Sequence, residues 1–237
     1  MATQNNAQSL DIEVALTKSE KFINQYKKQL IIAFVAIIAV AVAWFAGHRW
    51  MTNREDAAQT QLALGQQYFA TGAYDVALKG DSVKGAEAFK GYLKIADEYT
   101  FTDAANLARL YAGICYVQQG ETKKAIEQLE KFSTKGDATI SANALADLAN
   151  CYATDGQIDK AISKFKDAAA KADSPALSPI YLMQAAGLLE KQGDKAGANK
   201  LYLQVKNDYP TSQYSSVQNS NGVVIGAEID KYIERTK

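Results

Sequence analysis

The sequence predicts an all-α protein, in which one membrane-spanning helix precedes a solenoid of about four helical hairpins and a C-terminal capping helix. Three observations support this fold class. One uninterrupted apolar run lies near the N-terminus, glycines recur at similar spacing through the rest of the chain, and no alternating strand pattern appears after residue 57. We therefore expect a membrane anchor followed by a helical repeat domain.

Composition excludes several classes of protein. The chain has 237 residues with 26 basic and 26 acidic side chains, and this zero net charge argues against a general nucleic-acid binder, which needs a basic surface. An apolar fraction of 48% argues against disorder, and a content of only two Cys argues against a disulfide scaffold. We expect one folded domain in addition to the anchor.

The apolar run extends from Leu30 to Ala46, and the 20 residues of 29–48 carry no formal charge. At about 1.5 Å per residue, such a helix spans roughly 30 Å, the thickness of a bilayer core. A cleaved signal peptide is disfavoured because 29 residues precede the run and Trp44 and Phe45 lie near its end. A buried soluble helix is disfavoured because such long apolar runs are rare in soluble domains. We expect an uncleaved transmembrane helix at 29–48.

Flanking charges predict the orientation of this helix. Four lysines precede it, whereas two arginines follow it and are succeeded at once by two acidic residues. Because cytoplasmic flanks carry the excess of basic residues, we expect a cytoplasmic N-terminus and an exported C-terminal domain. The predicted segments are a cytoplasmic lead-in at 1–28, the transmembrane helix at 29–48, a juxtamembrane linker at 49–56 and the repeat domain at 57–237.

Within the lead-in, apolar residues recur at helical spacing over 10–28, with Lys and Glu between them. Two interpretations remain open for this segment. It is either an interfacial amphipathic helix that meets a partner or lipid headgroups, or a simple polar lead-in to the anchor.

Four glycines share a common pattern of neighbours. Each is followed by Ala after five residues and preceded by Gly or Ala at seven residues, and Tyr stands four residues before the first three, with Leu before the last. This pattern indicates helical hairpins, because Gly can end a helix in a left-handed cap and small residues let two helices approach closely. The glycines are Gly72, Gly120, Gly156 and Gly193.

The intervals between these glycines locate an insertion. Gly120 and Gly156 are 36 residues apart and Gly156 and Gly193 are 37 apart, whereas Gly72 and Gly120 are 48 apart. We place the insertion at 79–85 and expect a short broken helix there, followed by a helix from about residue 86 to residue 99. The terminal helix that closes the stack is predicted from a stripe of Ile225, Ile229, Tyr232 and Ile233.

Residues with the chemistry of catalysis are scarce. The single histidine, His48, lies at the predicted membrane edge, and neither a phosphate-binding glycine loop nor a Cys/His cluster with zinc spacing is present. We therefore expect no enzymatic activity, cofactor or metal. Cys115 and Cys151 occupy the same repeat position, where stacked hairpins hold equivalent residues too far apart for a disulfide, so we expect two buried free thiols.

The first helices of stacked hairpins line their concave side, so the repeat register predicts a groove for a partner. Its mixture of apolar and amide groups suits an extended segment or a partner helix. Alternatively, the first unit or its insertion covers Leu110, Tyr111 and Ile114. The predicted groove residues are Leu107, Leu110, Tyr111, Ile114, Asn143, Asp147, Asn150, Met183 and Gln184.

These repeats resemble the tetratricopeptide repeat (TPR), whose fold is a right-handed α-solenoid. The groove lacks the cations with which some members grip a terminal carboxylate. The whole layout, including GHRWMTNRE at the end of the anchor and DSPALSP at 173–179, resembles the YfgM-type ancillary subunits of the bacterial Sec translocon. The insertion and the NDYP sequence with its C-terminal extension depart from that pattern.

The resemblance implies a single-pass protein of the bacterial inner membrane with a periplasmic TPR domain. It also implies two partners, the SecYEG translocon and a membrane-anchored periplasmic chaperone of the prolyl-isomerase (PPIase) type. The function implied is that of a non-enzymatic adaptor or co-chaperone for exported proteins. The alternative is a scaffold for another envelope assembly, such as outer-membrane biogenesis or division. No nucleic-acid or small-molecule partner is expected.

Overall fold

The computed structural model of the chain describes residues 2–81, 88–215, 217–218 and 224–237. The chain forms two compact units, Met1–Arg54 and Glu55–Lys237. The described elements are α1 (Ala2–Ala70), α2 (Tyr74–Lys79), α3 (Tyr92–Glu98), α4 (Asp103–Gln118), α5 (Thr122–Glu130), α6 (Ala138–Thr154), α7 (Ile158–Ala172), α8 (Ser178–Gln192), α9 (Lys195–Asp208), β1 (Val217–Gln218), β2 (Val224–Gly226) and α10 (Glu228–Arg235). The predicted all-α class is confirmed, and β1 and β2 add one short antiparallel pair within the described residues.

The first unit is the part of α1 that carries the apolar run. Large apolar side chains project from it without cover, and Val40 and Trp44 are 69% and 71% exposed. Among the described residues, this is one helix long and apolar enough to cross a membrane. The exposure of so many apolar side chains on one helix is the pattern expected of a lipid-facing segment.

Residues 49–56, which the sequence assigns to a juxtamembrane linker, continue α1 without a break. The segment contains neither Gly nor Pro, so nothing in it stops a helix. Glu55 also belongs to the second unit, because its carboxylate accepts the backbone amides of Asp103 and Ala104 at 2.7 and 3.0 Å. A negative charge at these free amides stabilises the N-terminus of α4.

The first hairpin pairs the end of α1 with a second helix that is interrupted. Helix α2 stops at Lys79, and the backbones of Gly80 and Gly91 meet with φ of 92° and 87°. The amide of Asp81 donates to the carbonyl of Phe89 at 3.1 Å, and this bond joins the two ends of the segment between α2 and α3. Helices α2 and α3 both pack on α4. They therefore act as the two halves of one interrupted helix.

The segment between α2 and α3, residues 80–91, accounts for the long interval between the first two repeat glycines. The predicted insertion at 79–85 overlaps it, although residues 82–87 lie outside the described residues. The prediction of a helix from residue 86 is wrong for 88–91, which are not helical, since α3 begins only at Tyr92. Gly91 precedes it with a positive φ that cannot continue a right-handed helix.

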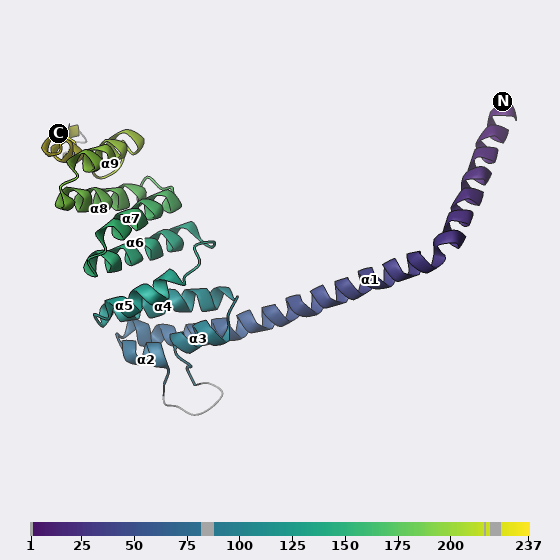
Figure 1. Cartoon of the computed structure of the whole chain (residues 1–237), viewed down its shortest axis with the longest axis horizontal. Helices are drawn as coiled ribbons and strands as arrows, with labels where there is room; N and C mark the ends of the chain where they lie inside the picture. Colours follow the sequence, from purple (N-terminus) through teal and green to yellow (C-terminus); the bar gives the residue numbers. More distant parts are fainter. Residues whose placement is uncertain (1, 82–87, 216, 219–223) are drawn as a thin grey trace. The chain divides into compact units, whose positions relative to one another are not determined.

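Helices α4 to α9 form three antiparallel hairpins stacked in chain order, α4 with α5, α6 with α7 and α8 with α9 (Figure 1). Each hairpin packs on the next through the α5–α6 and α7–α8 contacts. The interior is lined by small and medium side chains, among them Ala149, Ala168 and Ala186, each fully buried. This packing lets neighbouring helices lie close together along the whole stack.

All four repeat glycines lie at hairpin bends, as the sequence predicts. Their φ angles are between 74° and 86°, and in each bend the next residue donates its amide to the carbonyl four residues before the glycine, at 2.8–2.9 Å. A left-handed residue with a Cβ costs roughly 1–2 kcal/mol. A Cβ would meet nothing within 4 Å at Gly120, Gly156 or Gly193, so the backbone angle and not the packing selects glycine there.

Helix α10 closes the C-terminal end of the stack. Ile229 and Ile233 are buried against α8 and α9, as predicted, whereas Ile225 lies in β2 and not in the helix. Arg235 donates to both carboxylate oxygens of Glu190 in α8 at 2.9 and 2.6 Å. The cap is thus held by apolar burial and by a bidentate ion pair.

Candidate functional site

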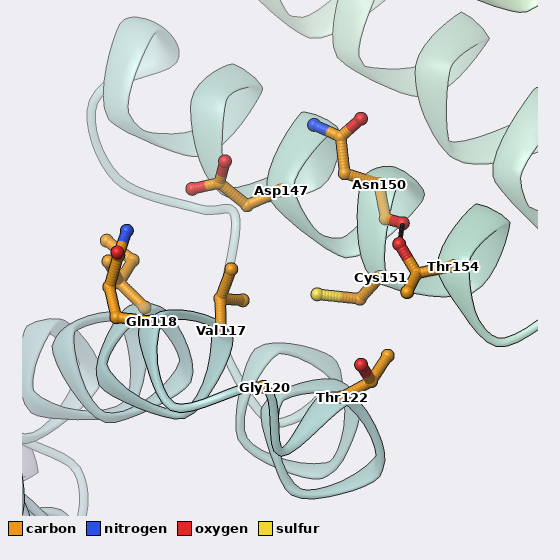
Figure 2. Close-up of a pocket in the computed structure, with 9 residues that line it drawn as sticks. Val117, Gln118, Gly120, Thr122, Asp147, Asn150, Cys151 and Thr154 are labelled. Carbon is orange, nitrogen blue, oxygen red and sulfur yellow. Dashed lines mark hydrogen bonds between the residues drawn. The ribbon is translucent and has the colours of Figure 1, made fainter.

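A pocket of about 310 Å³ lies where the end of α4, the start of α5 and the second half of α6 meet. We call it the Asp147 pocket. Cys151 projects from α6 towards Val117, and Asp147 lies above Val117 and Gln118, whereas the amide of Asn150 points away from α4 and α5 (Figure 2). Its lining residues are Ile114, Val117, Gln118, Gly120, Thr122, Asp147, Asn150, Cys151 and Thr154.

A second pocket of about 300 Å³ lies next along the stack, between α6, α7 and α8. We call it the Lys191 pocket, after the cation at its edge. Asn150 lines both pockets, so the two adjoin on the same face of α6. Its lining residues are Asn150, Ala153, Phe165, Gln184, Gly187, Leu188 and Lys191.

The structure brings some of the predicted groove residues together at these pockets. Ile114, Asp147 and Asn150 line the first, and Asn150 and Gln184 line the second. Asn143 is exposed nearby on α6, and its side-chain carbonyl accepts the hydroxyl of Tyr181 in α8 at 2.6 Å. This bond ties the first helices of two successive hairpins to each other.

The remaining predicted residues lie away from both pockets. Leu110 is buried in a cluster with residues of α5 and α6, and Met183 is half-buried against the core of the last hairpins. The ring of Tyr111 lies 5.2 Å from the rings of both Phe69 and Tyr92, which belong to the first hairpin. Leu107 packs against the same apolar cluster. The alternative that the first hairpin covers Leu110, Tyr111 and Ile114 therefore holds for Tyr111 but not for Leu110, which packs with α5 and α6, or for Ile114, which lines the Asp147 pocket.

Several lining residues are absent from the prediction. Val117 and Gln118 follow Ile114 by three and four residues, and Cys151 and Thr154 follow Asp147 and Asn150 by four. Lys191 follows Gly187 by the same interval. Extending the helical register by one turn towards each hairpin bend finds all of them.

Asp147 is the only charged side chain that lines its pocket within the described residues. No hydrogen bond or ion pair joins its carboxylate to another described residue. Its charge contributes to raising the pKa of Cys151 and that of Tyr181. Burial raises the pKa of this carboxyl above its ordinary value, because the pocket wall removes water that would stabilise the charge. The pocket therefore presents a carboxyl group that has no ion-pair partner among the described residues, in a place where burial disfavours its charge.

Comparison with known families agrees with this geometry. A family described as a tetratricopeptide repeat-like domain matches residues 20–221, which include the apolar run and the stack as far as α9. The chain belongs to the tetratricopeptide repeat-like domain family. The TPR-like fold is that of a scaffold for protein–protein interaction.

Two solved structures of TPR-like repeats are similar to this chain. One is the crystal structure of nearly identical TPR-like repeats of a Podosopora anserina protein described as a kinesin light chain, with 13% identity, a TM-score of 0.48, and coverage of 75% of this chain and 84% of that one. A single-substitution variant of the same repeats has 13% identity, a TM-score of 0.49 and coverage of 77% and 86%. No curated protein matches the chain.

The two thiols of the TPR-like domain are free and buried, which confirms the prediction. Cys115 is fully buried, and Cys151 is 4% exposed at the wall of the Asp147 pocket. Burial raises the pKa of Cys115 to about 12 and that of Cys151 to about 11, with the charge of Asp147 contributing to the second. Both thiols are therefore protonated and unreactive at neutral pH.

We expect native full-length protein in mild detergent to resist alkylation. At pH 8 iodoacetamide should modify either thiol about 100-fold more slowly than a model thiol, because the thiolate is scarce and shielded. Mass spectrometry of timed samples measures this rate. After unfolding without reductant both cysteines should react fully. Two unmodified cysteines in the unfolded chain would instead reveal a disulfide.

Proposed function

We propose that this chain is a non-enzymatic adaptor, in which an N-terminal membrane anchor holds a TPR-like stack that binds segments of other polypeptides. The observation that carries the proposal is the pair of adjoining pockets along α4, α6 and α8, which are lined by four of the nine residues that the repeat register assigns to a groove. Pockets of this size take side chains and not folded domains. A tether to the membrane raises the local concentration of the stack near membrane-bound partners.

We further propose a location and a set of partners. The excess of lysines before the apolar run favours a cytoplasmic N-terminus at 1–28, a span at 29–48 and an exported domain from 57 onwards. The similarity of the anchor region and of residues 173–179 to YfgM-type subunits favours the bacterial inner membrane, with SecYEG and a membrane-anchored PPIase-type chaperone as partners. Assistance to exported proteins as they leave the channel is the role that follows.

Site-specific photo-crosslinking tests the proposal. Probes at Asn150 and Gln184 are exposed at the pockets, and a probe at Lys123 is exposed on α5 outside both of them. We expect the first two to capture exported proteins, or subunits of the channel or chaperone, and Lys123 to capture fewer. Probes at Phe34 and Ile38 in the anchor should capture membrane subunits.

The partners recovered also separate the two envelope functions. Capture of outer-membrane biogenesis or division proteins in place of Sec subunits would reassign the adaptor to that assembly. Equal capture by all domain probes would show that the pockets are not the binding surface.

A further inference from the structure

The Asp147 carboxylate differs from two other acids of the stack, Glu190 and Glu130. Glu190 binds Arg235 in two hydrogen bonds and also accepts the hydroxyl of Tyr202, and Glu130 accepts the hydroxyl of Tyr152. Asp147 has no such partner among the described residues, although it lies in a pocket wall where burial disfavours its charge. A carboxylate in this position gains from any donor that enters the pocket.

The rest of the pocket limits what that donor can be. Ile114 and Val117 supply an apolar wall, while Gln118 and Thr122 are neutral, so no lining side chain within the described residues competes as a cation. The aliphatic stem of a lysine or arginine side chain can lie along such a wall while its charged head reaches an acid. A partner carboxylate would instead be repelled by Asp147.

The neighbouring Lys191 pocket has the opposite character. Its one charged lining residue among those described is Lys191, which disfavours a second basic side chain there. Its remaining wall is largely apolar, with Phe165 and Leu188. Asn150 stands between the pockets and offers both an amide donor and a carbonyl acceptor, which suit the backbone of a bound segment.

We propose that the Asp147 pocket receives a lysine or arginine side chain of a partner polypeptide, with an apolar residue of the same segment in the Lys191 pocket. This inference rests on the proposed adaptor function and adds its specificity. The groove thereby selects basic-apolar segments and rejects acidic ones. Charge complementarity at a desolvated carboxylate provides the selection, because an unmatched charge in the same place is costly.

The test uses the full chain in lipid nanodiscs and a set of synthetic peptides of about 12 residues. The peptides share flanking Leu, Val, Asn and Ser residues and differ at one central position, which is Lys, Arg, Gln or Glu. Fluorescence anisotropy measures their affinities. We expect the Lys and Arg peptides to bind about tenfold or more tightly than the Gln peptide, and the Glu peptide to bind least.

Two variants that remove the same charge provide the comparison. Asp147→Asn should abolish the preference for Lys and Arg while leaving the Gln peptide bound. Asp208→Asn removes an exposed carboxylate at the end of α9, outside both pockets, and should leave the preference intact. Because the folded protein disfavours the charge of Asp147, the Asn variant should unfold at no lower a temperature at neutral pH, which excludes misfolding as the cause.

Each other outcome counts against a defined part of the proposal. Equal affinity for the Lys, Gln and Glu peptides, or a basic preference that survives in Asp147→Asn, would overturn this inference while leaving the adaptor function standing. Failure of every peptide to bind would also overturn it. The absence of peptide binding would contradict the adaptor function only if the crosslinking probes at Asn150 and Gln184 also captured no protein.

Discussion

Replacement of Val35 and Ile38 by arginine should release the chain from the membrane. Both residues lie in the middle of the apolar run, and their side chains are 58% and 46% exposed on α1. An arginine at the centre of a spanning helix costs about 2.5–3.5 kcal/mol on insertion scales, so the pair opposes insertion by roughly 5–7 kcal/mol. Carbonate extraction of membranes should then leave the variant in the soluble fraction.

Membrane insertion can also be followed with a reporter that is fused after Lys237 and is active only in the exported compartment. The natural sequence should give activity and the double-arginine variant none. A variant with leucine at both positions keeps the apolar character and should behave as the natural sequence. Membrane retention of the arginine variant would mean that α1 is not what holds the chain there. Reporter silence in the natural sequence would reverse the proposed orientation.

Replacement of Gly113 by alanine should destabilise the stack. A Cβ at this position would lie 2.6 Å from Cγ and 2.7 Å from Cδ2 of Leu129, which is itself buried. Overpacking of this kind costs about 1–3 kcal/mol, because α4 and α5 must move apart. Thermal unfolding followed by circular dichroism in mild detergent measures the loss.

Gly187 provides the matched control. It also lies inside the first helix of a hairpin, but a Cβ there would meet nothing within 4 Å. Gly187→Ala should therefore stabilise the protein by about 0.5–1 kcal/mol, since alanine loses less conformational freedom on forming a helix. Gly113→Ala combined with Leu129→Ala should cost less than the sum of the two single changes. Equal effects of alanine at 113 and 187 would contradict the close contact between α4 and α5.

Close approach at Gly113 and the left-handed bends at the repeat glycines were both readable from the sequence. The left-handed bends depend on a property that glycine alone has, whereas the close approach needs only a small residue, Gly or Ala, and both recur at the same place in each hairpin. The apolar run was readable for a similar reason, because its length and lack of charge are local features.

The interrupted helix of the first hairpin was harder to locate. The 48-residue interval revealed an insertion, but the helix resumes only at Tyr92, after the backbones of Gly80 and Gly91 have come into contact. That meeting depends on backbone contacts between residues 11 positions apart. The role of Glu55 at the start of α4 is still harder to predict from the sequence, because its hydrogen bond joins residues 48 positions apart.

The candidate site was likewise only partly predictable from the sequence. Repeat register placed Asp147, Asn150 and Gln184 on the groove-facing side of their helices, because helical periodicity is local. It also placed Leu107 and Tyr111 there, yet Phe69 and Tyr92 of the first hairpin pack against Tyr111. Register assigns a side chain to a face, whereas its exposure depends on which neighbouring helix occupies that face.

The apolar run, the repeat and the position of each hairpin bend can be predicted from the sequence alone, since all of these follow from short-range patterns of apolar and glycine residues. The folded chain was needed to show that Tyr111 is covered and that Asp147 lines a pocket without an ion-pair partner among the described residues. The physical reason is that burial and pairing are properties of the surroundings. They depend on side chains from helices that are distant in the sequence, and a local sequence pattern does not show which of these side chains pack against a given residue.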